Sequence, residues 1–475
     1  MKQPSTSTEG ELPSVADIVE FVRSLGKPTV PEVLARAREL GRLAIQPRCG
    51  VGGHDEMLHL LRRLDDQAQP DVLTVTIDSH TRLNRLAQAS QVLRDSPQNL
   101  NGYPLVAHGW RRGRELNAAV RAPLEVRHGS PEPYSLLDVS LAAGFTSFEG
   151  GGISYNVPYA KDVSITDSMN AYRWVDARCA ELTAAGLVID RELFGTLTAV
   201  LVPPSISLAV SVIEAVAAVR EGVRCLSIAY PQGGNVVQDV AALRSIRVLA
   251  RRYLPVDVTV HPVLHEFMGV FPSGRVRADA LIFYGALVAR LGGASKLITK
   301  TNREAYGIPT AEANAEGMRL ARVADSPLLS FVRVDEDRVA EEAAWIQQEV
   351  DELVAPVLEA VDVQRGAAAA FERGLLDVPF SASRHARSAV IPRRDPGGSI
   401  RYLEPGGLPF SGKVRQRQRA LLAQCAAAND IDGSVRGLTS DINYFAGPDL
   451  REAFHAVASP LASLGGPITE RRARA

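Results

Sequence analysis

The feature of this 475-residue chain that most constrains its fold is a regular alternation of short β-branched runs with helix-length segments, which begins near residue 43. Strands separated by helices in this way run parallel, because each helix returns the chain to the start of the next strand. The alternation therefore predicts either a closed barrel or a doubly wound sheet. The candidate strands, one more than an eight-stranded barrel needs, are 43–46, 72–78, 105–108, 124–127, 146–149, 197–202, 226–229, 258–261 and 296–300.

Segments of a different character flank the alternating part. A polar start is followed by two amphipathic stretches, 15–25 and 31–40, that predict helices. Beyond residue 326 a long acidic stretch, 335–360, favours a helix, and Gly/Pro-rich segments follow it. We therefore divide the chain into an N-terminal disordered or helical segment (1–40), an α/β unit (41–326) and a C-terminal helical and irregular extension (327–475).

Composition excludes several classes of function. The chain has 53 Lys+Arg against 54 Asp+Glu, so it offers no basic excess for nonspecific binding to nucleic-acid phosphates. Aromatic residues make up 6% of the chain, which disfavours stacking platforms for single strands. The most apolar stretch, 197–219, is broken by Pro203 and Pro204 and contains Glu214, so it predicts a buried strand and helix rather than a membrane span.

The N-terminus and the cysteines indicate a cytoplasmic protein. Residues 1–10 are polar and lack the apolar region of a secretory signal. The cysteines form no C-x-x-C pair, which argues against a zinc ribbon and against a disulfide framework. They are Cys49, Cys179, Cys225 and Cys425.

Charged side chains gather where the predicted strands end. Arg48, Arg82 and Arg127 stand at the ends of three strands, Glu149 closes another and Lys300 closes the last. In parallel α/β folds, ligands bind at the carboxyl ends of the strands. Each guanidinium can form a bidentate fork with a carboxylate, so three arginines at this edge predict a ligand with two negative charges. The alternative is that each arginine pairs with a nearby Asp or Glu and has only a structural role.

The segment FEGGGISYNVPYA (148–160) is the densest polar signal in the chain. Three consecutive glycines permit positive φ angles and a close approach of the backbone to a ligand. Glu149, Tyr155 and Tyr159 can then supply a carboxylate and two phenols to one pocket. Such a carboxylate suits an ammonium group, as a charge partner or as a proton acceptor. The alternative is a glycine-rich turn whose tyrosines pack against the core.

Two apparent metal motifs are discounted. The residues DSH (78–80) begin like the D-x-H-x-x-G motif that supplies a cobalt-ligating histidine, but Leu83 stands where the final glycine belongs. His261 and His265 have the i, i+4 spacing of a zinc pair, yet Pro262 interrupts the helix that this spacing needs. We therefore assign no metal ligand in this chain.

Several segments occur in an order typical of one enzyme family: AIQPRCGVG (44–52), TIDSHTRLNR (76–85), LNGYP (100–104), RHGSPE (127–132), FEGGGISYNVPYAKD (148–162), LVPPSIS (201–207), MGVFP (268–272), KTNREAYGIPTAEAN (300–314), AFERGLLDVPF (370–380) and RYLEPGGLPF (401–410). Together they resemble the epsilon (large) subunit of glutamate mutase, also called methylaspartate mutase. The likeness covers most of the chain, and many long motifs in one order make it highly specific.

The resemblance implies a (β/α)8 TIM-type barrel with N-terminal helices and a C-terminal α+β extension. It implies adenosylcobalamin as cofactor, bound between this chain and a small cobalamin-binding sigma subunit that carries the cobalt ligand. An epsilon homodimer flanked by two sigma subunits is the expected assembly. The implied reaction is the radical interconversion of L-glutamate and (2S,3S)-3-methylaspartate, which begins with homolysis of the Co–C bond.

The resemblance also implies roles at matching positions. It implies substrate contacts from Arg48, Arg82, Arg127, His128, Glu149, Tyr155, Tyr159 and Glu192. It implies cofactor contacts from Gly50, Asn101, Pro158, Phe271, Lys300, Glu304 and Ile308. The residues expected to take part in catalysis are Glu149, Arg82, Lys300 and Glu304.

Two segments depart from the family pattern and leave the substrate open. The chain has AYPQGGN (229–235) where GYGECGN is expected, and HEFMG (265–269) where HQWMG is usual. The acidic Glu266 and the loss of a tryptophan can reshape the cofactor side. A related mutase that acts on another amino acid in secondary metabolism is therefore a second hypothesis.

Two further alternatives come from other classes of protein. A cobalamin-independent lyase or aldolase acting on a dicarboxylate would work without a partner, with Lys300 as its Schiff-base lysine. A non-catalytic relative would bind an amino acid or the cobalamin subunit as a regulator. Glu149, Lys300 and Glu304 argue against that relative, because simple binding needs no ribose-contacting pair.

Overall fold

The computed structural model describes residues 11–196, 200–426 and 435–446. Its centre is an eight-stranded sheet in the order β1-β8-β7-β6-β5-β4-β3-β2, in which each pair of neighbours is parallel. Backbone hydrogen bonds from Asp71 to Ile45 and from Thr76 to Cys49 join the two edges, which brings the sheet round into a barrel. The strands are β1 (Ala44–Pro47), β2 (Leu73–Thr76), β3 (Leu124–Arg127), β4 (Ser147–Glu149), β5 (Asp190–Leu193), β6 (Cys225–Pro231), β7 (Thr259–His265) and β8 (Lys296–Thr299).

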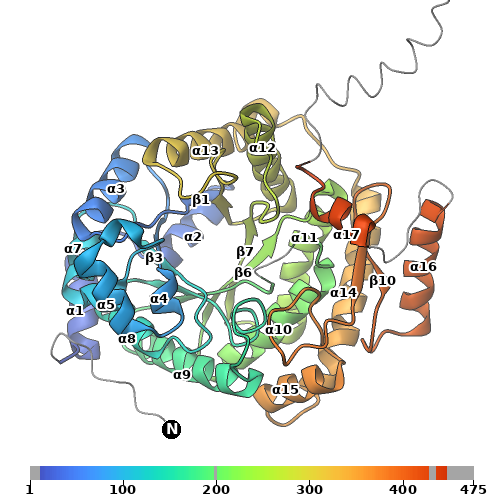
Figure 1. Cartoon of the computed structure of the whole chain (residues 1–475), viewed down its shortest axis with the longest axis horizontal. Helices are drawn as coiled ribbons and strands as arrows, with labels where there is room; N and C mark the ends of the chain where they lie inside the picture. Colours follow the sequence, from blue (N-terminus) through green and yellow to red (C-terminus); the bar gives the residue numbers. More distant parts are fainter. Residues whose placement is uncertain (1–10, 197–199, 427–434, 447–475) are drawn as a thin grey trace, which may run out of the picture.

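Helices surround the barrel (Figure 1), which confirms the (β/α)8 fold. A helix or helical cluster follows every strand, as parallel strands require. The longest lie on the β4 to β7 side, where α10 is buried along most of its length. The helices of the ring and its connections are α3 (His54–Gln67), α4 (Ser79–Arg82), α5 (Leu86–Asp95), η1 (Pro97–Asn99), α6 (Leu105–His108), α7 (Trp110–Ala118), α8 (Tyr134–Ala142), α9 (Ile165–Ala184), α10 (Pro204–Arg220), α11 (Val236–Tyr253), α12 (Arg275–Gly292) and α13 (Ala311–Ala324).

Seven of the nine sequence-derived strands overlap observed strands, and two predictions are wrong. Residues 105–108 form helix α6, since a run of four residues carries too little periodicity to separate a buried helical turn from a strand. Of the predicted strand 197–202, residues 197–199 lie outside the described residues, and Val200 and Leu201 form a turn. The fifth strand is β5, which the prediction missed because its sequence, DREL, carries three charged residues.

The two N-terminal helices are confirmed as α1 (Val15–Ser24) and α2 (Val30–Glu39). Each begins with a capping box, in which Ser14 or Thr29 satisfies a backbone N–H of the first turn. Between them, the ammonium group of Lys27 donates to the backbone carbonyls of Asn117, Val120 and Ala122 at 2.5–3.0 Å. These bonds fasten the N-terminal helices to the segment that leads into β3.

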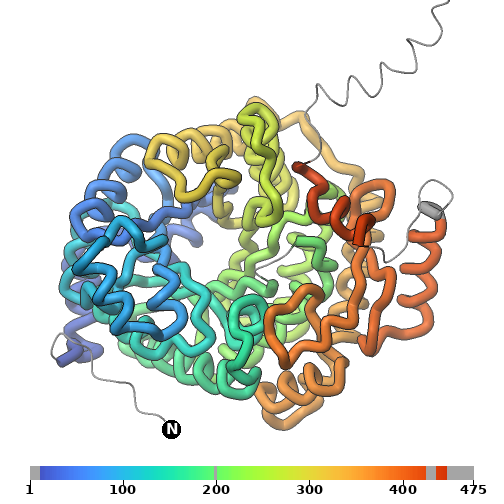
Figure 2. Tube along the Cα trace, in the orientation of Figure 1, coloured from blue at the N-terminus to red at the C-terminus, as the bar shows by residue number. Residues whose placement is uncertain are grey.

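The C-terminal extension packs on the outside of the barrel (Figures 1 and 2). Helix α14, expected at 335–360, bonds to the ring through Ser205 and Glu349, 2.6 Å apart, and through Gln238 and Glu342, 3.0 Å apart. The division into three segments stays a prediction. The elements of the extension are η2 (Pro327–Leu329), α14 (Glu336–Leu358), α15 (Val363–Arg373), β9 (Ile391–Arg394), β10 (Ile400–Glu404), α16 (Gly412–Ala426) and α17 (Val435–Ile442).

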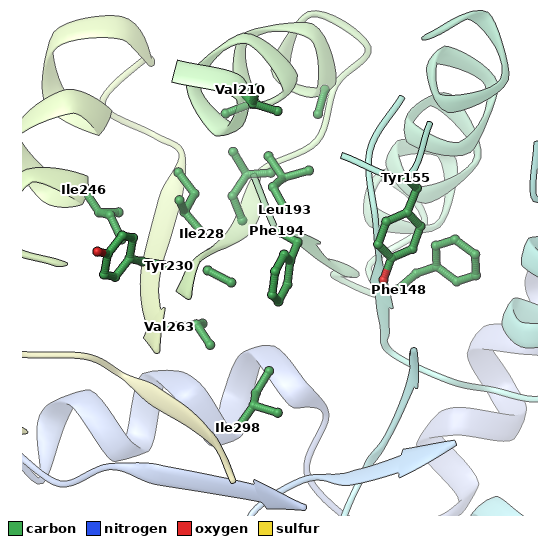
Figure 3. Packing of buried hydrophobic residues seen from close by; sticks show 14 of the residues in the cluster. Phe148, Tyr155, Leu193, Phe194, Val210, Ile228, Tyr230, Ile246, Val263 and Ile298 are labelled. Atoms are coloured by element: carbon green, nitrogen blue, oxygen red, sulfur yellow. The ribbon is translucent and has the colours of Figure 1, made fainter. Parts of the chain in front are cut away.

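Apolar side chains fill the space between sheet and helices (Figure 3). Phe148 of β4, Leu193 of β5 and Val210 of α10 are at most 1% exposed. This packing fixes the strand ends that carry the charged residues described below. Among the helices that the structure describes, none combines the length and the apolar character needed to cross a bilayer.

Candidate functional site

Arg127 lies at the centre of a cluster of charged groups inside the barrel. Its guanidinium bonds to Glu125 at 2.8 Å, to Glu192 at 2.9 Å and also to Glu149. All four side chains are at most 4% exposed. The flanking carboxylates hold the pKa of Arg127 above its usual range, although burial opposes them. Three of its five N–H donors are used in this way, so a ligand can still bind to the others.

Lys296 neutralises part of the negative charge of Glu125 and Glu192 in this cluster. Its ammonium group lies 2.6 Å from Glu125 and 2.5 Å from Glu192, and it has no exposed surface. Burial raises the pKa of Glu125, but Lys296 and Arg127 outweigh burial and lower it overall. Two cations thus balance Glu125 and Glu192. Glu149 is the carboxyl group that remains without a full counter-charge.

Glu149 ends β4 and faces this cluster. The hydroxyl of Tyr155 donates to its second oxygen, and Arg127 donates to its first. Burial raises the pKa of Glu149 to about 7, with Arg127 opposing and Glu192 and Glu125 adding to the rise. A carboxylate has more acceptor positions than these two bonds occupy, so Glu149 can still accept a bond from an ammonium group.

Arg48 and Arg82 are the cations of the site that have no carboxylate partner among the residues the structure describes. Both are partly buried, and Nε of Arg48 is buried without a hydrogen-bond partner. The Arg82 guanidinium lies 5.8 Å from the centre of the Tyr159 ring. Burial raises the pKa of Tyr159, while Arg48 and Arg82 lower it, so both guanidinium groups lie near one phenol.

His128 is held by protein groups on both sides of its ring. The N–H of Ser130 donates to Nδ1 at 3.0 Å, and Nε2 therefore carries the proton that bonds to the Glu149 carbonyl at 2.8 Å. Burial lowers the pKa of His128 to about 3. The structure thus places His128 next to the site as a neutral side chain that holds the backbone of Glu149, and a substrate contact would compete with these bonds.

Lys300 and Glu304 follow β8 and lie at the mouth of the site. Their side chains pair at 2.5 Å, with Lys300 buried and Glu304 19% exposed. Burial lowers the pKa of Lys300, Glu304 raises it, and the positive charge of Arg48 lowers it further, which places Arg48 near this pair. Glu266 fixes the loop by accepting the backbone N–H of Lys300 at 2.6 Å.

The remaining predicted cofactor contacts differ in their surroundings. Gly50 lies against β2, where a Cβ atom would come within 2.6 Å of the Thr76 carbonyl oxygen, so tight packing by itself explains this glycine. The amide oxygen of Asn101 accepts the N–H of Ser79 at 2.9 Å.

Ile308 is 53% exposed and Phe271 is 7% exposed, and both come from loops at the carboxyl ends of the strands. Pro158 is partly buried beside Tyr159.

The sequence analysis assigned no role in the site to several buried charged residues of this region, among them Glu125, Lys296, Arg191 and Glu214. For Glu125 a signal existed, because the period of two along LEVR places it on the same face as Arg127. For Lys296 and Glu214, the groups that each one binds come from a distant part of the chain, and for Arg191 the strand that carries it was not recognised.

A groove lies at the opposite end of the barrel. This groove of about 820 Å³ is lined by residues that precede β1, β2 and β3. Charged residues that line this groove are paired with each other, as in the Arg42–Asp71 pair at 2.7 Å and the Arg121–Asp65 pair at 3.0 Å. Ligands bind at the carboxyl ends of the strands in this fold, so we place the candidate site there and not in this groove.

Comparisons with known proteins show which family the sequence matches. A family model described as methylaspartate mutase E chain (MutE) matches residues 27–450. The chain is 40% identical to the glutamate mutase epsilon subunit of Desulfitobacterium hafniense, over 86% of this chain and 87% of that protein. It is 42% identical to the subunit of the same name from Haloarcula marismortui, over 84% and 83%. It is 38% identical to that of Escherichia coli O157:H7, over 87% and 89%.

Similarity to solved structures is distant. N-(5'-phosphoribosyl)anthranilate isomerase from Pyrococcus furiosus aligns with 59% of this chain and 99% of its own, at 9% identity and a TM-score of 0.30.

Proposed function

The chain belongs to the methylaspartate mutase E chain family, and from this premise we propose that it is the catalytic large subunit of an adenosylcobalamin-dependent glutamate mutase. The proposed reaction is the radical interconversion of L-glutamate and (2S,3S)-3-methylaspartate, which makes the chain an isomerase. The observation that carries the proposal is the pair Arg48 and Arg82, two cations without carboxylate partners among the described residues, whose charges act on the same Tyr159 phenol as the carboxyl group of Glu149.

The site suits an amino acid with two carboxylates. Arg48 and Arg82 can each offer a planar fork to a carboxylate, and Arg127 has donors left for the same purpose. Glu149 can bind the ammonium group through its free acceptor positions and can take a proton from it, since its pKa of about 7 suits proton exchange near neutrality. Tyr155 holds this carboxyl group in place through its hydroxyl.

The residues at the mouth of the site fit adenosylcobalamin. The Lys300–Glu304 pair supplies a donor and a partly exposed acceptor that suit the ribose hydroxyls. Phe271 and the exposed Ile308 supply apolar surface for the less polar parts of the cofactor. When bound, adenosylcobalamin supplies the homolytic chemistry that starts the rearrangement. Gly50, Asn101 and Pro158 complete the proposed cofactor side.

A partner subunit is expected to cover this mouth. The name epsilon subunit, carried by the relatives, implies further subunits, and we propose a small cobalamin-binding sigma subunit that ligates the cobalt. The loops after β7 and β8 expose Val270, Tyr306 and Ile308, and the first turn of α12 exposes Val276; these side chains would otherwise face water. We propose an epsilon homodimer with two sigma subunits, located in the cytoplasm.

Turnover measurements test this proposal. L-Glutamate is incubated anaerobically with the chain and adenosylcobalamin, with and without the small subunit, and 3-methylaspartate is detected by NMR. We expect product only when both proteins and the cofactor are present. Cleavage of a dicarboxylate by this chain alone, without adenosylcobalamin, would favour the cobalamin-independent lyase, and turnover of another amino acid but not glutamate would favour the related mutase. No turnover of any amino acid would favour the regulator.

Replacing Arg82 by lysine should lower kcat/KM for L-glutamate by about 10- to 100-fold. An ammonium group keeps the charge but cannot form the planar two-point bond with a carboxylate. Arg85→Lys is the matched control, because Arg85 is exposed in the same segment, and it should leave kcat/KM within about twofold. Equal kcat/KM for the two variants would remove Arg82 from the site.

The pH dependence should report the ionisation of Glu149. Below its pKa of about 7, Glu149 is protonated and neutral and loses its attraction for an ammonium group. We therefore expect kcat/KM to fall by up to about tenfold per pH unit below pH 7, and to level off above it. A kcat/KM that stays constant between pH 8 and pH 5.5 would show that binding does not need the ionised carboxylate.

A further inference from the structure

Two buried charged residues that the mechanism above does not use bind the backbone of the glycine-rich loop after β4 (150–155) and of the end of β4 itself. We propose that Arg191 of β5 and Glu214 of α10 are positioning residues for Glu149 and Tyr155, an inference that rests on the proposed function. Arg191 is fully buried and Glu214 is 3% exposed, so both act inside the protein. No role at these two positions follows from the resemblance to the family.

Arg191 holds the backbone on both sides of Glu149. Its Nη1 donates to the carbonyl of Phe148, and its Nη2 donates to the carbonyl of Gly150 at 2.7 Å. Asp176 of α9 orients the guanidinium by accepting from Nε at 2.8 Å. Side chains alternate along β5, so Glu192 faces the charged interior of the barrel while Arg191 points outward, toward α9. Arg191 therefore clamps the carbonyl groups of the two residues that flank Glu149 without entering the substrate site.

Glu214 holds the next part of the same loop. One of its carboxylate oxygens accepts the backbone N–H groups of Ile153 and Ser154, each at 2.8 Å. These peptide groups directly precede Tyr155, whose hydroxyl bonds to Glu149. A Cβ atom on Gly151 would come within 2.2 Å of the Glu214 carboxyl group, so this glycine is needed for the carboxyl group to reach the loop.

The two clamps together fix the geometry of the Tyr155–Glu149 bond. Gly150 adopts a φ of +106°, and a Cβ atom there would lie 2.6 Å from the Tyr155 ring, so the loop turns sharply between the two residues. A displacement of about 1 Å at a reacting group can cost about 100-fold in rate. Loosening the loop should therefore lower kcat without removing any group that contacts substrate.

The first test compares two substitutions of Glu214 in the assembled enzyme with L-glutamate. Glu214→Leu leaves both N–H groups without an acceptor, and we expect kcat to fall about 10- to 100-fold while KM changes less than threefold. Glu214→Gln keeps a carbonyl oxygen for both N–H groups and should retain kcat within about threefold. Glu349→Leu is the matched control, because Glu349 is equally buried but lies on α14 and bonds to Ser205 and Gln418.

A second readout separates local positioning from general instability. Amide hydrogen exchange over residues 148–160 should become faster in Glu214→Leu and stay unchanged in Glu349→Leu, although both variants lower the melting temperature. Equal exchange rates over 148–160 in both variants would overturn the inference, and so would an unchanged kcat in Glu214→Leu. If the wild-type complex turns over no glutamate, the proposed function fails, and the exchange comparison still decides whether Glu214 holds the loop.

Arg191 is tested by Arg191→Lys, which keeps the charge but cannot donate to both carbonyls and to Asp176 at once. We expect kcat to fall about 10-fold or more, with faster exchange over 148–160. The matched control is Arg401→Lys, since Arg401 is also buried and paired, with Glu342 and Asp395 in the C-terminal extension. The same kcat and the same exchange over 148–160 in both variants would remove Arg191 from this role.

Discussion

Glu149→Gln should lower kcat for L-glutamate by about 10²- to 10⁴-fold, the range typical of losing a positioned acid–base group. Glutamine keeps the shape of the side chain and can still accept the Tyr155 hydroxyl bond. It removes the negative charge that is proposed to face the substrate ammonium group. It also leaves Arg127 with one carboxylate fewer, which further disfavours a cation at this position.

The control for this experiment is Glu349→Gln. Burial raises the pKa of Glu349 to about 7, as it does for Glu149, but Glu349 lies on α14 outside the barrel. We expect kcat of this control to stay within about twofold of wild type. The fall in kcat/KM below pH 7 should also disappear in Glu149→Gln. A Glu149→Gln enzyme with at least half the wild-type kcat would exclude the proposed role.

Lys296→Met should lower the free energy of unfolding by about 3–5 kcal/mol, because it leaves the buried carboxylates of Glu125 and Glu192 without one of their two cations. The measurement is denaturant unfolding of the purified chain at pH 8. Lys413→Met is the control, since Lys413 is exposed and contacts only the Trp345 ring in the contacts described, at 4.8 Å. We expect that control to lose about 1 kcal/mol or less.

The same variant should recover stability in mild acid. Without Lys296, burial is no longer balanced, so the folded-state pKa of Glu125 should rise above its unfolded value. A carboxyl group with a raised pKa in the folded state contributes most to stability at low pH and loses that contribution as pH rises through the raised pKa. The loss caused by Lys296→Met should therefore be smaller at pH 5.5 than at pH 8. An equal loss at both pH values would contradict the described pairing.

Part of the candidate site followed from sequence alone. Arg48, Arg82, Arg127, Glu149 and Lys300 were expected at the carboxyl ends of strands, and the structure places them there. The reason is local, since a strand ends where its apolar run ends, and parallel strands bring those ends to one edge. The sequence predicted three equivalent arginines for the ligand. In the structure Arg127 differs from the other two, because it is bonded to three carboxylates of the protein.

The residues that hold the loop after β4 from outside the barrel could not be predicted from the sequence. Glu214 was noted only as a charge that interrupts an apolar stretch, and its function in the fold depends on Ile153 and Ser154, about 60 residues earlier. Arg191 was not noted at all, because its strand was not recognised. Contacts between segments so far apart have no pattern within a short window of sequence.

The sequence by itself determined the parallel α/β class and the set of motifs that specify the family, because both depend on short runs of residues in a fixed order. Only the tertiary structure decided that DREL is a strand, since Asp190 and Glu192 can enter the barrel interior only where Lys296 and Arg127 arrive from β8 and β3. It likewise decided which arginines of the site lack a carboxylate partner among the described residues, and which carboxyl group bonded to Arg127 has its pKa raised to about 7. The physical reason is that burial and charge act through space, whereas periodicity acts along the chain.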